Sequence, residues 1–71
     1  MHLREITETL KKRRKLLGLT QVKFTELSGV SLRAIKALES GKSNPTFETL
    51  TRLAEVLDME LNLEFKLPKF F

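Results

Sequence analysis

Apolar residues recur along the chain at the three- and four-residue spacing of amphipathic α-helices, in four successive stretches. The first covers about residues 3–17, the second and third begin after Thr20 and Ser31, and the fourth covers about residues 47–57. The four apolar stripes consist of Leu3, Ile6, Leu10 and Leu17; Phe24 and Leu27; Ile35 and Leu38; and Phe47, Leu50, Leu53, Ala54 and Leu57. This pattern predicts an all-α domain of four helices over residues 1–58.

Capping residues and turns divide the second helix from the third. Thr20 and Ser31 can each accept hydrogen bonds from the free N–H groups at a helix start. Gly29 and Gly41 stand where a helix ends in the left-handed conformation that glycine adopts cheaply. Residues 20–41 therefore have the layout of a helix-turn-helix, whose second helix reads DNA. An ordinary helical hairpin is the alternative, but caps, turn and apolar spacing all favour the helix-turn-helix.

The spacing changes to strict alternation from Glu60 to Leu67. One face of this segment then carries Leu61, Leu63, Phe65 and Leu67. Alternation predicts a β-strand, which has no partner within a four-helix domain. The simplest partner is the same strand of a second copy, paired antiparallel across a homodimer. We expect residues 59–71 to form a dimerisation strand and tail, with Leu61, Leu63 and Phe65 at the interface. A frayed helical tail and an edge completed by another protein are the alternatives.

Arg14 interrupts the apolar stripe of the first helix. A charged side chain at a core-facing position is costly unless an opposite charge pairs with it. Glu39 lies four residues after Ile35, on the edge of the apolar face of the third helix, whereas Glu26 lies on the outer side of the second. The spacing therefore predicts an ion pair between Arg14 and Glu39 that joins the first helix to the reading helix.

Length and charge narrow the class of protein. Seventy-one residues allow one small domain with a marginal core, and the absence of cysteine excludes disulfides and thiolate metal sites. Residues 11–42 contain nine Lys or Arg and two Glu, a net charge of +7, and the rest of the chain carries −3. The basic run at residues 11–15 alone is commonly a solvated helix face. The excess nevertheless coincides with the helix-turn-helix, which is the polarity that phosphate binding needs.

Other function classes find little support in the residues. His2 is the only histidine, and no metal-ligand cluster, Gly-rich phosphate loop or nucleophile-base pair is present. We therefore expect no enzyme activity, no metal and no cofactor. No apolar run approaches the roughly 20 residues of a membrane span, and the N-terminus lacks a signal-peptide core. These features predict a cytoplasmic protein that does not bind membranes.

Together these motifs resemble the Cro/CI-type (Xre-like) helix-turn-helix family of bacterial and phage repressors over about residues 6–57. The matching residues are Arg14, Gly18 to Gln21, Phe24, Gly29 to Ser31, Ile35, Leu38, Glu39, Gly41 and Lys42. The resemblance implies a salt bridge between the positions of Arg14 and Glu39, in agreement with the pair expected from spacing. Thr25 stands where the family usually has alanine.

With the C-terminal strand included, the chain resembles HipB and its short relatives, the antitoxin and repressor partners of HipA-type Ser/Thr kinases. The resemblance implies an antitoxin that binds the operator of its own toxin-antitoxin operon and also binds a HipA-like kinase or an associated toxin component. A solitary phage or restriction-modification regulator remains an alternative, as does a protein-interaction module on the same scaffold.

The expected DNA contacts divide into base readers and phosphate anchors. In a dimer the two reading helices would enter successive major grooves, so the double-stranded operator should be an inverted repeat. The expected base readers are Leu32, Arg33, Lys36 and Ala37, and the expected phosphate contacts are Gln21, Lys42, Ser43 and Asn44. Arg33 is the best single candidate, because its guanidinium can donate to O6 and N7 of guanine together.

Overall fold

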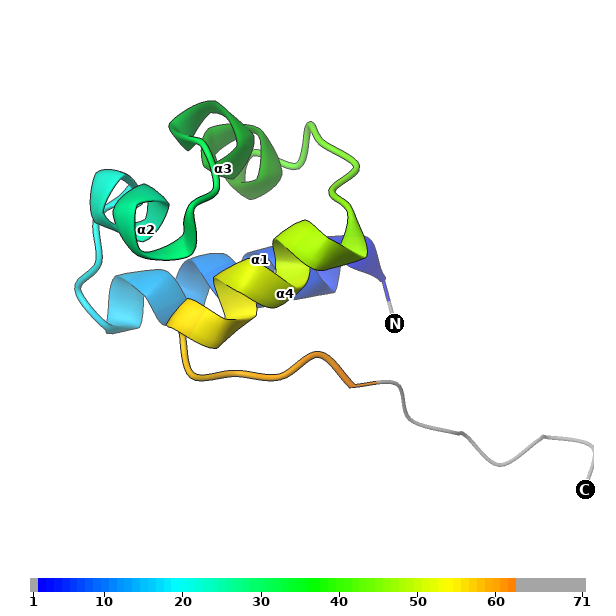
Figure 1. Ribbon diagram of the computed structural model, residues 1–71. Coiled ribbons are helices and arrows are strands. Elements are labelled where there is room, and N and C mark those ends of the chain that lie inside the picture. Colours follow the sequence, from blue (N-terminus) through cyan, green and yellow to red (C-terminus); the bar gives the residue numbers. More distant parts are fainter. Residues whose placement is uncertain (1, 63–71) are drawn as a thin grey trace, which may run out of the picture.

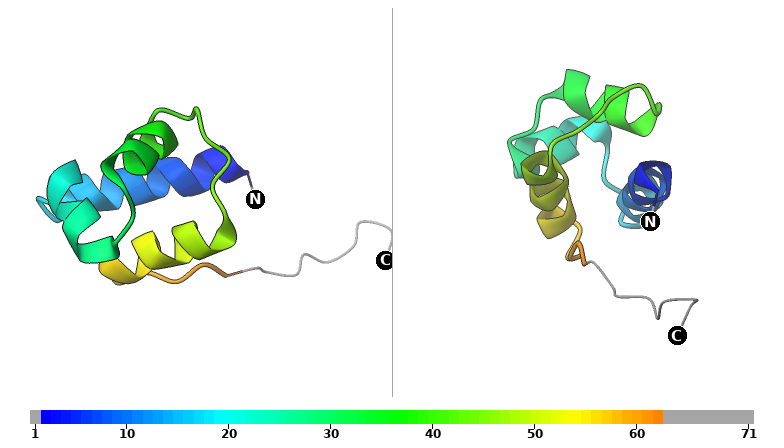
Figure 2. Two further views of the ribbon diagram at one scale, coloured as in Figure 1. Left: turned by 45° about the horizontal axis from the view of Figure 1, so that its top comes forward. Right: turned by 90° about the vertical axis from the view of Figure 1, so that its right-hand side faces the viewer.

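The computed structural model describes residues 2–62 and forms four α-helices within them. α1 spans Leu3–Leu16, α2 Gln21–Ser28, α3 Leu32–Glu39 and α4 Phe47–Val56. α1 and α4 run side by side, and α2 and α3 lie across one side of this pair (Figures 1 and 2). α2 packs against α3 and α4, and α3 also contacts α1. The four predicted helices are confirmed, with α1 and α4 each ending one residue earlier than expected. None of the helices in this described part is both long and apolar enough to span a bilayer.

Hydroxyl caps begin the last three helices, and those at Thr20 and Ser31 are the caps that the sequence predicts. The side-chain oxygens of Thr20, Ser31 and Thr46 accept hydrogen bonds at 3.0, 3.1 and 3.1 Å from the backbone N–H groups three residues later. Each bond satisfies an N–H group that the helix itself leaves without a partner. Gly29 ends α2 with a φ of 75°, in the left-handed region. The cap and the glycine together fix the sharp turn from α2 into α3.

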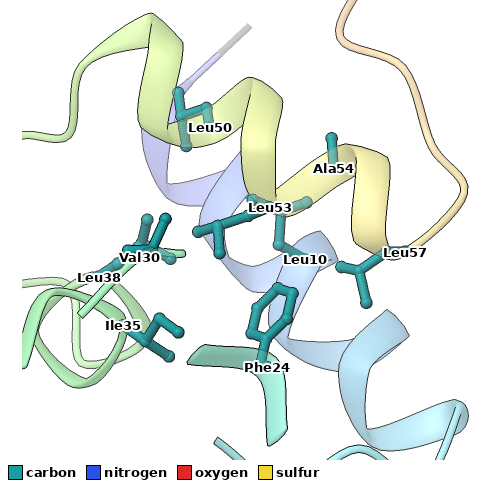
Figure 3. Packing of buried hydrophobic residues seen from close by; sticks show 9 residues of the cluster. All are labelled: Leu10, Phe24, Val30, Ile35, Leu38, Leu50, Leu53, Ala54 and Leu57. Atoms are coloured by element: carbon teal, nitrogen blue, oxygen red, sulfur yellow. The ribbon is translucent and has the colours of Figure 1, made fainter. Parts of the chain in front are cut away.

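The apolar core lies between the four helices (Figure 3). Its buried members are Leu10, Phe24, Val30, Ile35, Leu38, Leu50, Leu53, Ala54 and Leu57. Phe24 is 1% exposed and projects from α2 toward α1 and α4. Val30, which is also buried, closes the corner of the turn. Because all four helices contribute to one cluster, the core holds α3 in a fixed orientation.

Four stripe positions are exposed, contrary to the sequence prediction. Leu3, Leu17, Leu27 and Phe47 are 37%, 46%, 52% and 69% exposed. All four lie in the first or last turn of a helix or directly after it, where neighbouring helices no longer cover the side chain. Helical periodicity assigns a face to a residue but does not say where along the helix the covering neighbour ends.

The chain reverses direction after α4 at Asp58, which has a φ of 57°. Residues 59–62 then run back beneath α4 (Figure 1), and Met59 and Leu61 pack against the core. Residues 60–62 form no strand within the single chain, and the strand pairing with a second copy stays a prediction. The rest of the predicted strand and the tail, including Leu63 and Phe65, lie outside the described residues.

The Thr25 hydroxyl of α2 is buried and has no hydrogen-bond partner among the described residues. An unsatisfied buried hydroxyl costs about 1–3 kcal/mol, and valine has nearly the same shape without the hydroxyl. We expect Thr25→Val to raise the free energy of unfolding by about 1 kcal/mol, which is about 4–8 °C in Tm for a domain of this size. Thermal unfolding followed by circular dichroism measures this. Thr25→Ser, which keeps the hydroxyl, should be no more stable than wild type, and a valine variant that melts below wild type would contradict the assignment.

Candidate nucleic-acid interface

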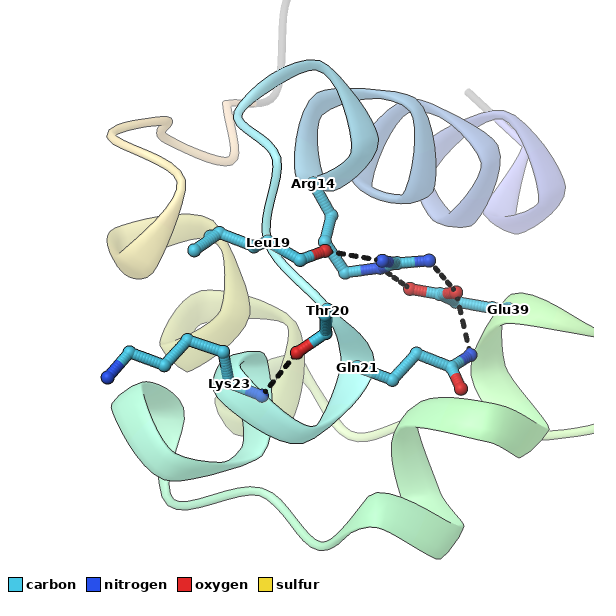
Figure 4. Close-up of polar contacts among 6 residues, drawn as sticks. All are labelled: Arg14, Leu19, Thr20, Gln21, Lys23 and Glu39. Carbon is cyan, nitrogen blue, oxygen red and sulfur yellow. Dashed lines mark hydrogen bonds and ion pairs between the residues drawn. The ribbon is translucent and has the colours of Figure 1, made fainter.

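A buried ion pair joins α1 to the end of α3 (Figure 4). Arg14 Nε donates to Oε2 of Glu39 at 2.7 Å, and Arg14 Nη2 donates to Oε1 at 2.9 Å. The third contact runs from Arg14 Nη1 to the carbonyl oxygen of Leu19 at 2.6 Å. The side chains of the pair are only 9% and 4% exposed. The partners are those that the spacing predicts, and the two-point contact fixes both the distance and the rotation of α3 relative to α1.

Gln21, the first residue of α2, joins the same pair. Its Nε2 donates to Oε1 of Glu39 at 3.0 Å, so α1, α2 and α3 meet at one carboxylate (Figure 4). Burial raises the pKa of Glu39. Hydrogen bonds from Arg14 and Gln21, together with the charges of Arg14 and Lys11, lower this pKa by more than burial raises it. The pKa therefore lies below the ordinary value, and the carboxylate is ionised at neutral pH.

The outward face of α3 carries all four expected base readers. Arg33 and Lys36 are exposed, and Leu32 and Ala37 are half-buried. Ile35, on the opposite face, is 0% exposed. Within residues 2–62 neither Arg33 nor Lys36 has a carboxylate within ion-pair distance. Two cations without an internal counter-charge thus lie on a rigid helix, which suits binding to an anionic partner.

The expected phosphate contacts flank α3 but differ in availability. Lys42 and Asn44 are exposed in the turn after α3, where the Lys42 N–H donates to the carbonyl of Ala37 at 2.9 Å. Gln21 is half-buried, with its amide engaged by Glu39. The Ser43 hydroxyl oxygen is buried, so it is not presented to solvent as a phosphate contact requires. Loop geometry, which the sequence pattern does not specify, turns this side chain inward.

The basic run at residues 11–15 divides between structural and exposed roles. Arg14 enters the buried pair, and Arg13 Nε donates to the carbonyl oxygen of Leu57 at 3.3 Å. Arg13 thereby satisfies a terminal carbonyl of α4 and ties α4 to α1. Sequence reasoning missed this role. The available signal is that Arg13 lies three residues after the buried Leu10, on the side of α1 that faces the core.

Comparison with known proteins gives one family and two relatives. A helix-turn-helix family model matches residues 10–63. The chain is 34% identical over 58 residues to the cryptic phage CTXphi transcriptional repressor RstR of Vibrio cholerae, covering 82% of this chain and 52% of that protein. It is 35% identical over 60 residues to the uncharacterized HTH-type transcriptional regulator YqaE of Bacillus subtilis, covering 84% of this chain and 52% of that protein. The chain spans about half the length of these relatives.

Proposed function

We propose that this chain, which belongs to the Cro/CI-type helix-turn-helix family, is a sequence-specific DNA-binding transcriptional repressor. The observation that carries this proposal is the α3 face, where Arg33 and Lys36 are exposed and form no ion pair within residues 2–62, while Ile35 anchors the opposite side. The two relatives, which are named as a phage transcriptional repressor and a transcriptional regulator, support it.

In this proposal, affinity and specificity come from different residues. α3 enters the major groove, where its four base readers reach base edges. Lys42 and Asn44 after α3, and Gln21 at the start of α2, contact phosphates and set the position of α3 along the duplex. Phosphate contacts carry no sequence information, so they strengthen binding to every duplex alike. The buried pair between Arg14 and Glu39 takes no part in DNA contact. Together with Gln21, it holds α2 and α3 in fixed positions relative to each other.

Selection from a random duplex library, followed by fluorescence anisotropy, tests the proposal. We expect the selected duplex to be an inverted repeat that binds on the order of 10³-fold or more tightly than a scrambled duplex at physiological salt. Affinity should also fall linearly on a log-log plot against salt concentration. Binding with neither sequence preference nor salt dependence would overturn the proposal and favour a protein-interaction module.

We further propose a homodimer joined by antiparallel pairing of residues 60–66 from two copies. The alternating sequence supports this, and a twofold dimer matches an inverted repeat. Since Leu61 packs against the core of its own chain, Leu63 and Phe65 are expected to supply most of the interface.

Leu63→Glu and Phe65→Glu should each produce a monomer in sedimentation velocity, because each places a charge in an apolar interface. Glu64→Lys, on the polar face of the same segment, is the matched control and should remain dimeric. A wild-type chain that is monomeric at micromolar concentration would contradict the proposed homodimer.

A HipB-like antitoxin role is a second candidate, favoured by where the acidic groups lie. Glu55, Asp58 and Glu60 form no ion pair among the described residues and lie on α4 or directly after it, on elements other than α3. A HipA-like kinase or associated toxin component bound there would leave α3 accessible, so toxin and DNA would bind together and strengthen repression by linkage. Co-purification with proteins encoded beside this chain tests this role. A partner that competes with DNA, or no partner, would favour a solitary phage or restriction-modification regulator.

A further inference from the structure

The side of α1 that faces the end of α3 carries a lysine. Two neighbours define this side: Arg14 pairs with Glu39, and Thr7 lines a polar hollow that it shares with Glu39 and the turn after α3. Lys11 lies four residues after Thr7 and three before Arg14. Residues at these spacings are neighbours on a helix surface. Lys11 therefore lies beside the end of the reading helix, although it is distant from α3 in sequence.

Lys11 forms no ion pair within residues 2–62. Glu8, three residues before Lys11 on α1, pairs with Arg4, and the charge of Lys11 contributes to the lowered pKa of Glu39 on α3. Arg14 already contacts both carboxylate oxygens of Glu39, and Lys11 has no ion pair within 4.0 Å among the described residues. Lys15, exposed and one turn further along, is likewise without an ion pair in that part of the chain. These two lysines leave two positive charges on one side of α1.

The other basic residues of the segment 11–15 lie elsewhere on α1. Arg13 is bound to the end of α4, and Arg14 is buried. Lys12 is exposed and lies about 60° around the helix from Lys15, but about 160° from Arg14, the residue of α1 that pairs with α3. Lys11 and Lys15 lie about 60° and 100° around the helix from Arg14, so they are the two lysines of residues 11–15 nearest the side of α1 that faces α3. Their Cα atoms are about 6 Å apart along the helix axis, a length over which one DNA strand presents about two phosphates.

We propose that Lys11 and Lys15 form a second phosphate-binding row, on α1, which contacts the DNA backbone outside the base pairs read by α3. This inference rests on the proposed function and deepens it, because it enlarges the stretch of DNA that one subunit covers. The row supplies affinity to every duplex and leaves base preference to α3.

Salt titrations of the full chain test the row. Lys11→Gln and Lys15→Gln, singly and together, are compared with Lys12→Gln, which removes the same charge from another side of α1. The probes are a fluorescein-labelled 40-base-pair mixed-sequence duplex and the duplex obtained by selection. Each row variant should flatten the slope of log affinity against log salt by about 0.9 per half-site, equivalent to about an eightfold smaller gain per half-site between 1 M and 0.1 M salt. Lys12→Gln should change the slope far less, and all variants should melt within a few degrees of wild type.

A second measurement locates the contact along the DNA. Shortening the flanks of the selected duplex should weaken wild-type binding but leave the affinity of the double variant nearly unchanged. Equal effects of Lys11→Gln and Lys12→Gln on the slope would overturn the row, because the charges would then act diffusely. A double variant that binds like wild type would also overturn it, while the proposed function would stand. A wild-type chain that binds no duplex would instead reject the proposed function, and the row with it.

Discussion

Replacing Glu39 by glutamine is expected to lower the free energy of unfolding by about 3–5 kcal/mol. The variant leaves the guanidinium of Arg14, whose side chain is 9% exposed, without a compensating charge. A domain of this length has a total stability of roughly 4–10 kcal/mol, so one substitution removes a large share of it. Each kcal/mol corresponds to about 4–8 °C in Tm at this size. Circular dichroism melts should therefore show a variant that is partly unfolded near room temperature or only slightly above it.

A double-mutant cycle measures the interaction energy between Arg14 and Glu39 apart from the contacts that each makes with other residues. Arg14→Met alone should also be strongly destabilising, whereas the double variant, which buries no charge, should be more stable than the two single losses added together predict. Lys23 and Glu26 provide an exposed control pair at 3.5 Å, with side chains 56% and 60% exposed. Their coupling should be about 0–1 kcal/mol. Absence of coupling between positions 14 and 39 would show that the contact does not stabilise the fold.

The same carboxylate predicts how stability depends on pH. In the folded chain the pKa of Glu39 lies below its ordinary value of 4.5, so the ionised group stabilises the fold above that pH. Its contribution decreases below pH 4.5 and is lost as the pH falls through the lower folded pKa. Urea denaturation at a series of pH values should show a steeper acid loss for wild type than for Glu39→Gln. Parallel curves would contradict the lowered pKa.

Arg33→Ala should cost about 1–3 kcal/mol per half-site, which is about 2–6 kcal/mol for a dimer on a complete inverted repeat. In the proposed complex, the substitution removes from each α3 a guanidinium that would donate to two guanine acceptors. Base preference should relax at one position in each half-site and remain elsewhere. Anisotropy titrations against duplexes substituted at each position measure both effects. Stability should be unaffected, because Arg33 is exposed and forms no ion pair within residues 2–62.

Lys42→Ala is the matched comparison, since it also removes one exposed cation close to α3. It should weaken the selected and scrambled duplexes by the same factor and flatten the salt slope by about 1 per half-site. The ratio of the two affinities should therefore fall only for the Arg33 variant. If Arg33→Ala weakens both duplexes equally, Arg33 contacts phosphate and does not read bases.

Features that depend on local spacing could be predicted from the sequence. The caps at Thr20 and Ser31, and the pairing of Arg14 with Glu39, follow from residue type and helical periodicity. Contacts that depend on how helices distant in sequence pack against one another could not be predicted. Arg13 donates to Leu57 across 44 residues of chain, a contact that exists only because α1 and α4 lie side by side. The inward Ser43 hydroxyl likewise depends on loop geometry, for which no periodicity exists.

The alternation of buried and exposed positions along α3 also bears on how such a protein would diverge. Within the eight residues of α3, Ile35, Leu38 and Glu39 hold the helix in place. Arg33 and Lys36 point outward. Substitutions at the outward positions leave the anchoring contacts intact. After a gene duplication, one copy can therefore acquire a new target through a few nucleotide changes, without first passing through an unstable intermediate.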